Sequence, residues 1–231
     1  MPAILLNALG VLLGALAGRW SPWAPQADTQ RQLRLALTAL TVLAGVWVIW
    51  SALPSQPWPG MRTLIIAVLS LSAGSLIGHG IGFQRGLSRL LAWAGSGRTS
   101  SEPGFAFESV VFAGNPLGIA GAVLQGATGD WRPLALKAAL DALAAFGFAR
   151  AGSNTAALAA VPVFAIQETL AGLAGMLQQR LADPQLTAAL ATACGLLTLT
   201  AAPVVLGIRR VPLANYLPAL VLAPLIASVW R

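Results

Sequence analysis

The sequence predicts an all-α protein, a polytopic transmembrane helical bundle of about eight spans with an inverted repeat around two central spans. The chain of 231 residues is 57% hydrophobic and only 9% charged, and its mean hydropathy is +0.75. Soluble domains carry about 25% charged residues. The apolar residues also form runs of bilayer-crossing length, about 17 to 25 residues. We therefore expect a single transmembrane domain over residues 1–231.

The predicted spans follow one another with short connections and one long loop. In chain order they cover residues 3–19, 34–52, 62–81, 108–126, 133–149, 156–178, 186–206 and 212–229. The first span lacks the basic segment of a signal peptide, so we expect it to be retained. The loop 82–107 is the long one, and its first part predicts an amphipathic helix on the membrane surface.

The arginines predict the orientation, because cytoplasmic loops are enriched in basic residues. The loops after spans one, three, five and seven hold Arg19, Arg31, Arg34, Arg85, Arg89, Arg98, Arg150, Arg209 and Arg210. The opposite side holds Arg62, Arg132, Arg180 and Arg231. We therefore expect both termini outside the cytoplasm, periplasmic or extracellular. This assignment requires span four to cross fully rather than to be re-entrant.

The two ends of the chain resemble each other, which predicts an internal repeat. Residues 12–49 and 168–208 each contain a Gly/Ala-rich helix, a loop with Ala-Asp-x-Gln, and a Thr/Ala/Leu helix. Spans one to three then correspond to spans six to eight, and an offset of five spans inverts the second copy. The alternative is a chance likeness of Ala/Leu/Gly helices. The predicted units are repeat one at about 3–81, central spans at about 108–149, and repeat two at about 156–229.

Small residues at four-residue spacing predict faces where helices pack closely. The predicted packing positions are Gly10, Gly14, Gly18, Gly74, Gly78 and Gly121. Such ridges join helices within one subunit or between subunits, and they are the basis for expecting a homo-oligomer, with a dimer favoured. Direct lining of a pore by glycine backbone is the alternative.

Charged and polar residues inside predicted spans are the candidates for function. Lys137 and Asp141 are one helical turn apart, so they can pair, and a charge near the bilayer centre costs roughly 2.5–3.5 kcal/mol. They form either a structural salt bridge or part of a relay or solute site. Asn115-Pro116 interrupts span four, either as a simple kink or as the broken helix of a transporter site. The full predicted pathway comprises Asn7, Asn115, Pro116, Gln125, Asp130, Lys137, Asp141, Gln167, Glu168 and Asn215.

Other classes of function lack their sequence signals. The chain has none of the zinc-protease, nucleophile-elbow, phosphate-loop or dinucleotide-binding motifs, so we do not expect an enzyme. One histidine and one cysteine, Cys194, cannot form a His/Cys metal cluster or an intrachain disulfide. We therefore expect no metal and no cofactor. The scattered basic residues form no patch for nucleic acid, which leaves the lipid bilayer as the expected partner.

Several positions carry a family resemblance. They are Asn7 with Gly10, Gly14 and Gly18; Phe112; Gly121 and the run Gly126-x-x-Gly129-Asp130; Lys137-x-x-x-Asp141; Gln167; and Asn215-x-x-Pro218-Ala219. With these residues the chain resembles the YqgA-like family of bacterial inner-membrane proteins of unknown function. The family pattern has glycine at Asn115, an acidic residue at Gln125 and serine at Ala138. The resemblance implies a multi-spanning fold and a bacterial inner-membrane location, and it supplies no substrate.

These observations lead to two hypotheses about function. The first is a transporter or channel for a small solute or ion, with a polar site at the membrane midplane on spans four to six. The second is a non-transporting scaffold or assembly factor whose buried charges are structural. A membrane-embedded enzyme ranks behind both, because no nucleophile or metal set is found.

Overall fold

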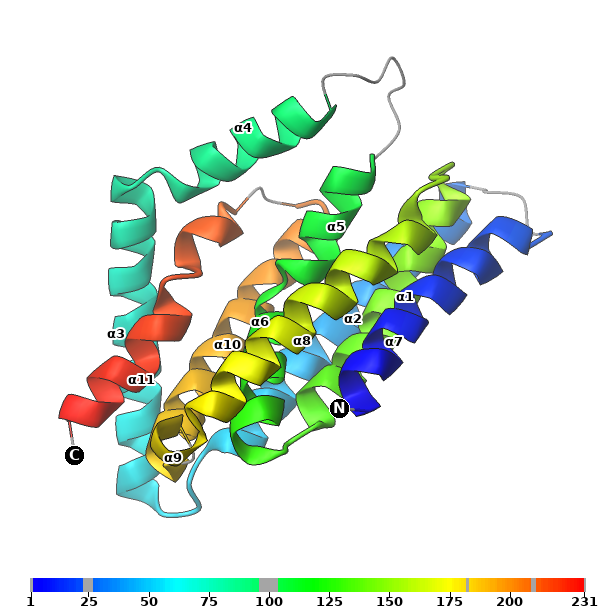
Figure 1. Ribbon diagram of the computed structural model, residues 1–231. Coiled ribbons are helices and arrows are strands. Elements are labelled where there is room, and N and C mark those ends of the chain that lie inside the picture. Colours follow the sequence, from blue (N-terminus) through cyan, green and yellow to red (C-terminus); the bar gives the residue numbers. More distant parts are fainter. Residues whose placement is uncertain (1, 23–26, 96–103, 182, 209–210, 231) are drawn as a thin grey trace.

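The computed structural model describes residues 2–22, 27–95, 104–181, 183–208 and 211–230, and these residues form helices and turns without strands (Figure 1). The long helices are α1 (Pro2–Trp20), α2 (Ala27–Ala52), α3 (Pro57–Gly80), α7 (Arg132–Arg150), α8 (Ala160–Met176) and α10 (Pro184–Val205). The shorter helices are α4 (Phe83–Gly95), α5 (Phe105–Ala113), α6 (Pro116–Thr128), α9 (Gln178–Leu181) and α11 (Ala219–Val229). Two 3-10 helices, η1 (Ala156–Ala159) and η2 (Leu213–Tyr216), complete the described elements.

The long helices lie side by side in one bundle (Figure 1). Helix α1 packs on α7, α2 on α10, α6 on α8, and α3 on both α10 and α11. Helix α4 runs crosswise to α3 at one end of the bundle, and the two chain termini are labelled toward the other end (Figure 1). The amphipathic helix expected at the start of the long loop is therefore present as α4.

Five described helical segments are long and apolar enough to cross a membrane: Pro2–Trp20, Gln30–Ala52, Pro57–Gly80, Ala156–Met176 and Pro184–Val205. The bent pair of α5 and α6 makes a sixth if it is one span. Helix α7 has the length of a span but carries four charged residues, and the apolar segment Leu213–Val229 is shorter. The described residues thus form a helical bundle with five or six candidate membrane spans, whereas the count of eight spans stays a prediction.

The expected break in span four is present between α5 and α6, whose axes differ in direction by 53°. Asn115 is the N-cap of α6, and its side chain accepts a hydrogen bond of 2.9 Å from the Leu117 N–H. Pro116 follows at the first helical position, where a missing N–H removes no helical bond. The Asn-Pro pair therefore starts a new helix rather than kinking an old one.

The predicted glycine positions all make close helix contacts within the chain. A Cβ atom at Gly14 would lie 2.1 Å from the Ala142 carbonyl oxygen of α7, and Gly10 and Gly18 approach α7 in the same way. Gly74 and Gly78 lie against Ala219 and Asn215, and Gly121 lies against Leu134. Because these ridges are occupied within one chain, the expected homo-oligomer needs a different argument.

Some sequence predictions fall outside the described residues. They concern Arg98, Arg209, Arg210 and Arg231 in the orientation argument, Ala182 of the repeated loop, and residues 96–103 of the long loop.

Candidate functional site

Lys137 and Asp141 form an ion pair inside the bundle, as their spacing predicts. The Lys137 Nζ atom donates to Asp141 Oδ2 across one turn of α7. Both side chains are buried, with exposed fractions of 1% and 6%. The two charges therefore compensate each other, which is the condition under which a buried charge is tolerated.

Two amide side chains from other helices extend this pair. Asn7 of α1 donates from Nδ2 to the Oε1 atom of Gln167 on α8, at 3.1 Å. Asn7 also lies close to the Asp141 carboxylate. Both amides are fully buried. Polar residues from α1, α7 and α8, up to 160 positions apart, thus lie together inside the bundle.

The first turn of α6 also packs against this group. A Cβ atom at Gly118 would lie 2.4 Å from Lys137 Cε and 2.9 Å from Gln167 Nε2. The absence of a side chain at this position therefore lets the lysine and the glutamine lie directly against the α6 backbone. We call Asn7, Gly118, Lys137, Asp141 and Gln167 the buried polar cluster.

Two side-chain atoms of the cluster have no hydrogen-bond partner. Among the described residues, the buried side-chain atoms without a hydrogen-bond partner are Asn7 Oδ1, Arg62 Nε, Gln125 Oε1, Gln167 Nε2 and Thr192 Oγ1. Three of the five belong to predicted pathway residues. Buried polar groups in native proteins are normally paired. One unpaired donor and one unpaired acceptor beside an ion pair therefore give this cluster the means to hold a polar ligand.

The other predicted pathway residues lie at separate places. Asn115 and Pro116 begin α6 just before Gly118, and Gln125 lies two turns further along the same helix. Asp130 is in the α6–α7 turn, where its Oδ1 accepts from the Arg132 N–H at 3.1 Å. Glu168 is half-buried on α8, about 100° around the helix axis from Gln167.

Asn215 has a structural contact at one end of the bundle. Its Oδ1 atom accepts from the Gln84 N–H at 2.9 Å, and the Gln84 side chain accepts in turn from the Ala214 N–H at 3.3 Å. These bonds join the start of α4 to η2. The structure does not bring Asn215 to the buried polar cluster.

Glu108 is a buried carboxylate that was not among the predicted pathway residues. It lies on α5, is fully buried, and accepts hydrogen bonds from the hydroxyls of Ser153 and Thr155, the latter at 2.7 Å. Both hydroxyls come from the turn between α7 and η1. The available signal was a carboxylate in an apolar run, but nothing local indicates which distant turn supplies its donors.

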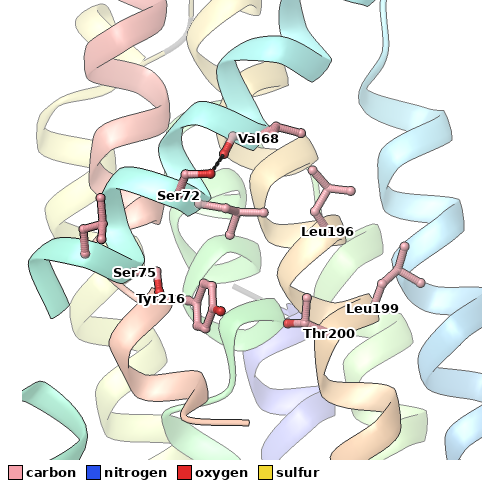
Figure 2. A pocket seen from close by; sticks show the side chains of 9 residues that line it. Val68, Ser72, Ser75, Leu196, Leu199, Thr200 and Tyr216 are labelled. Atoms are coloured by element: carbon pink, nitrogen blue, oxygen red, sulfur yellow. Dashed lines mark hydrogen bonds between the residues drawn. The ribbon is translucent and has the colours of Figure 1, made fainter. Parts of the chain in front are cut away.

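A groove of about 640 Å³ lies elsewhere, between α3, α10 and η2 (Figure 2). Leucines form much of its wall, and its hydroxyl groups come from Ser72, Ser75, Thr200 and Tyr216. The hydroxyls of Ser72 and Thr200 donate to backbone carbonyls of their own helices. The groove is lined by none of the predicted pathway residues, so it is separate from the buried polar cluster.

The fold and the cluster together define a class: a helical membrane protein with a Lys–Asp pair buried beside a broken helix. The chain belongs to the family described as "Protein of unknown function (DUF554)", whose model matches residues 2–228. This result confirms the resemblance to YqgA-like proteins.

Two relatives match nearly the whole chain. The chain is 30% identical to "Uncharacterized protein YqgA" of Escherichia coli (strain K12), over 97% of this chain and 95% of that protein. It is 23% identical to "Uncharacterized membrane protein YdfK" of Bacillus subtilis (strain 168), over 97% and 95%. No solved structure matches the chain.

Proposed function

We propose that the protein is a transporter or channel for a small solute or ion, and that its path passes the buried polar cluster. The observation that carries the proposal is the pair of unpaired atoms, Asn7 Oδ1 and Gln167 Nε2, beside a buried ion pair. A salt bridge with a purely structural role needs no unpaired hydrogen-bonding groups beside it. Intramembrane polar residues commonly mark solute or ion paths, and broken helices commonly line them.

The proposal includes an inverted repeat of eight spans around the cluster. It is supported by a reciprocal contact between α2 and α10, the second span of each predicted copy. A Cβ atom at Gly45 would lie 2.9 Å from the Gly195 carbonyl oxygen, and one at Gly195 would lie 2.8 Å from the Gly45 carbonyl oxygen. Two elements related by a twofold axis make such reciprocal contacts.

The remaining parts of the proposal follow from the sequence. They are a bacterial inner-membrane location, termini outside the cytoplasm and no enzymatic activity. The alternative function is a non-transporting scaffold in which the Lys137–Asp141 pair is structural.

Flux through purified protein in liposomes separates these two functions. The informative variant is Lys137→Met/Asp141→Asn, because it removes both charges and leaves neither of them buried without a partner. Flux of protons, sodium, potassium and chloride would be measured for the wild type and the variant. We expect the double variant to fold and to lose the flux seen for the wild type.

The matched control is Asp183→Asn, the same carboxylate-to-amide change at the N-cap of α10, where asparagine caps equally well. It should keep wild-type flux. If instead the double variant transports as fast as the wild type, the charges are structural and the path lies elsewhere.

A further inference from the structure

The positive end of α6 lies inside the bundle, next to the buried polar cluster. Pro116, Leu117 and Gly118 form the first turn of this 13-residue helix, and all three are buried. The aligned peptide dipoles of a helix place roughly half a positive charge at its N-terminus. Because the span is broken here, a helix N-terminus with its partial positive charge lies inside the bundle. An uninterrupted helix would have no terminus at this position.

The amide nitrogen of Gln167 lies against this turn. Its Nε2 atom would be 2.9 Å from a Cβ atom at Gly118, and it has no hydrogen-bond partner although the side chain is fully buried. The orientation of the amide follows from its Oε1 atom, which accepts from Asn7. An amide nitrogen only donates, so the unused capacity at this turn is that of a donor.

Lys137 brings a second set of donors to the same place. Its Cε atom lies against Gly118, and its ammonium group has three donor hydrogens and Asp141 as its carboxylate partner. The lysine and aspartate charges cancel, so the field of α6 is left without a counter-charge in the cluster. Donors from Lys137 of α7 and Gln167 of α8 thus both lie against the first turn of α6.

We propose that the ligand of the buried polar cluster is a small monovalent anion, either an inorganic ion or the carboxylate of a small solute. This inference rests on the proposed function and names the ligand of the same site. The anion accepts from Gln167 Nε2 and the Lys137 ammonium group, and the N-terminus of α6 stabilises its charge. A metal cation is disfavoured because the described residues contain no group of three or more His, Cys, Asp or Glu side chains that could hold one.

Thermal unfolding of the full-length protein in detergent tests the inference. The melting temperature would be measured in sodium chloride, sodium formate and sodium gluconate at equal sodium concentration. A ligand that binds only the folded state raises the melting temperature. We expect a higher value in chloride or formate than in gluconate, which is too large for a buried site. Chloride alone indicates an inorganic ion, and formate indicates a carboxylate.

Gln167→Met removes the unpaired donor, and Thr192→Val is its control, a fully buried side chain on α10 whose hydroxyl is also unpaired. Losing a hydrogen bond to a charged group weakens binding roughly tenfold or more, so the anion effect should disappear in Gln167→Met and persist in Thr192→Val. If Gln167→Met does not fold, Lys137→Met/Asp141→Asn gives the second test and should also lose the anion effect.

Two results would overturn the inference: equal melting temperatures of the wild type in all three anions, or a wild-type anion effect in either site variant. The proposed transport function is tested by a different measurement, the flux through the protein in liposomes. Anion-dependent stability without flux refutes transport alone, and flux without anion-dependent stability refutes the anion site alone.

Discussion

Asp141 is the carboxylate partner of Lys137, so replacing it with an uncharged residue leaves a buried ammonium group without its counter-charge. The lysine is 1% exposed and its neighbours in the cluster are two amides and a glycine backbone. An uncompensated buried charge destabilises a protein by about 3–5 kcal/mol, whereas removing both partners of an ion pair is often nearly neutral. At the scale of the residue, the two charges therefore depend on each other.

This dependence predicts a strongly non-additive mutant cycle. Asp141→Asn and Lys137→Met should each lower the free energy of unfolding by about 3–5 kcal/mol. The double variant should lie within about 1–2 kcal/mol of the wild type, because neither charge is left alone. Reversible unfolding in mixed micelles with increasing denaturing detergent gives the four values. Additive losses would mean that the two residues do not act as a pair.

Helices α1 and α7 are joined by backbone contacts rather than by a layer of side chains. Three glycines of α1, at positions 10, 14 and 18, each face a carbonyl oxygen of α7. Such close approach gains dispersion contacts that lipid cannot replace, which makes small residues favourable at membrane helix interfaces. The contact leaves no space for even one methyl group.

Gly14→Ala tests this contact at the scale of the element. Its Cβ atom would lie 2.1 Å from the Ala142 carbonyl oxygen, so α1 and α7 must separate. We expect a loss of about 1–3 kcal/mol in unfolding free energy. The control is Gly147→Ala within α7, where a Cβ atom meets nothing within 4 Å. That change should be neutral or stabilising by about 0.5–1 kcal/mol, because alanine favours helix. Equal effects of both substitutions in the same unfolding assay would contradict the contact.

The orientation of the whole molecule is open to a labelling experiment. Cys194 is the sole cysteine and is buried, so Cys194→Ala provides a background for single cysteines. Pro22→Cys changes an exposed residue that follows α1, and Gln56→Cys changes an exposed residue that precedes α3. The arginine distribution predicts that a membrane-impermeant maleimide labels Gln56→Cys in intact cells and labels Pro22→Cys only after lysis. The reverse pattern would invert the proposed orientation.

Local chemistry explains which features were predictable from the sequence. The break at Asn115-Pro116 follows from the N-cap preference of asparagine and the missing N–H of proline, and the Lys137–Asp141 pair follows from helical spacing. The meeting of Asn7 with Gln167 does not follow from any local rule, since it depends on which helices become neighbours across the bundle. The partners of Glu108 and Asn215 were missed for the same reason.

The glycine contacts also have a mechanical consequence for the buried polar cluster. Helices α1 and α7 are held together backbone to backbone, and α6 and α8 are held likewise where a Cβ atom at Gly126 would lie 2.1 Å from the Ala171 carbonyl oxygen. Asn7, Lys137 and Asp141 belong to the first pair of helices, whereas Gly118 and Gln167 belong to the second. The cluster therefore lies at the interface between these two closely packed helix pairs. The 3.1 Å hydrogen bond from Asn7 to Gln167 crosses that interface. If the α1–α7 pair moved away from the α6–α8 pair, the cluster would open while the glycine contacts within each pair stayed intact.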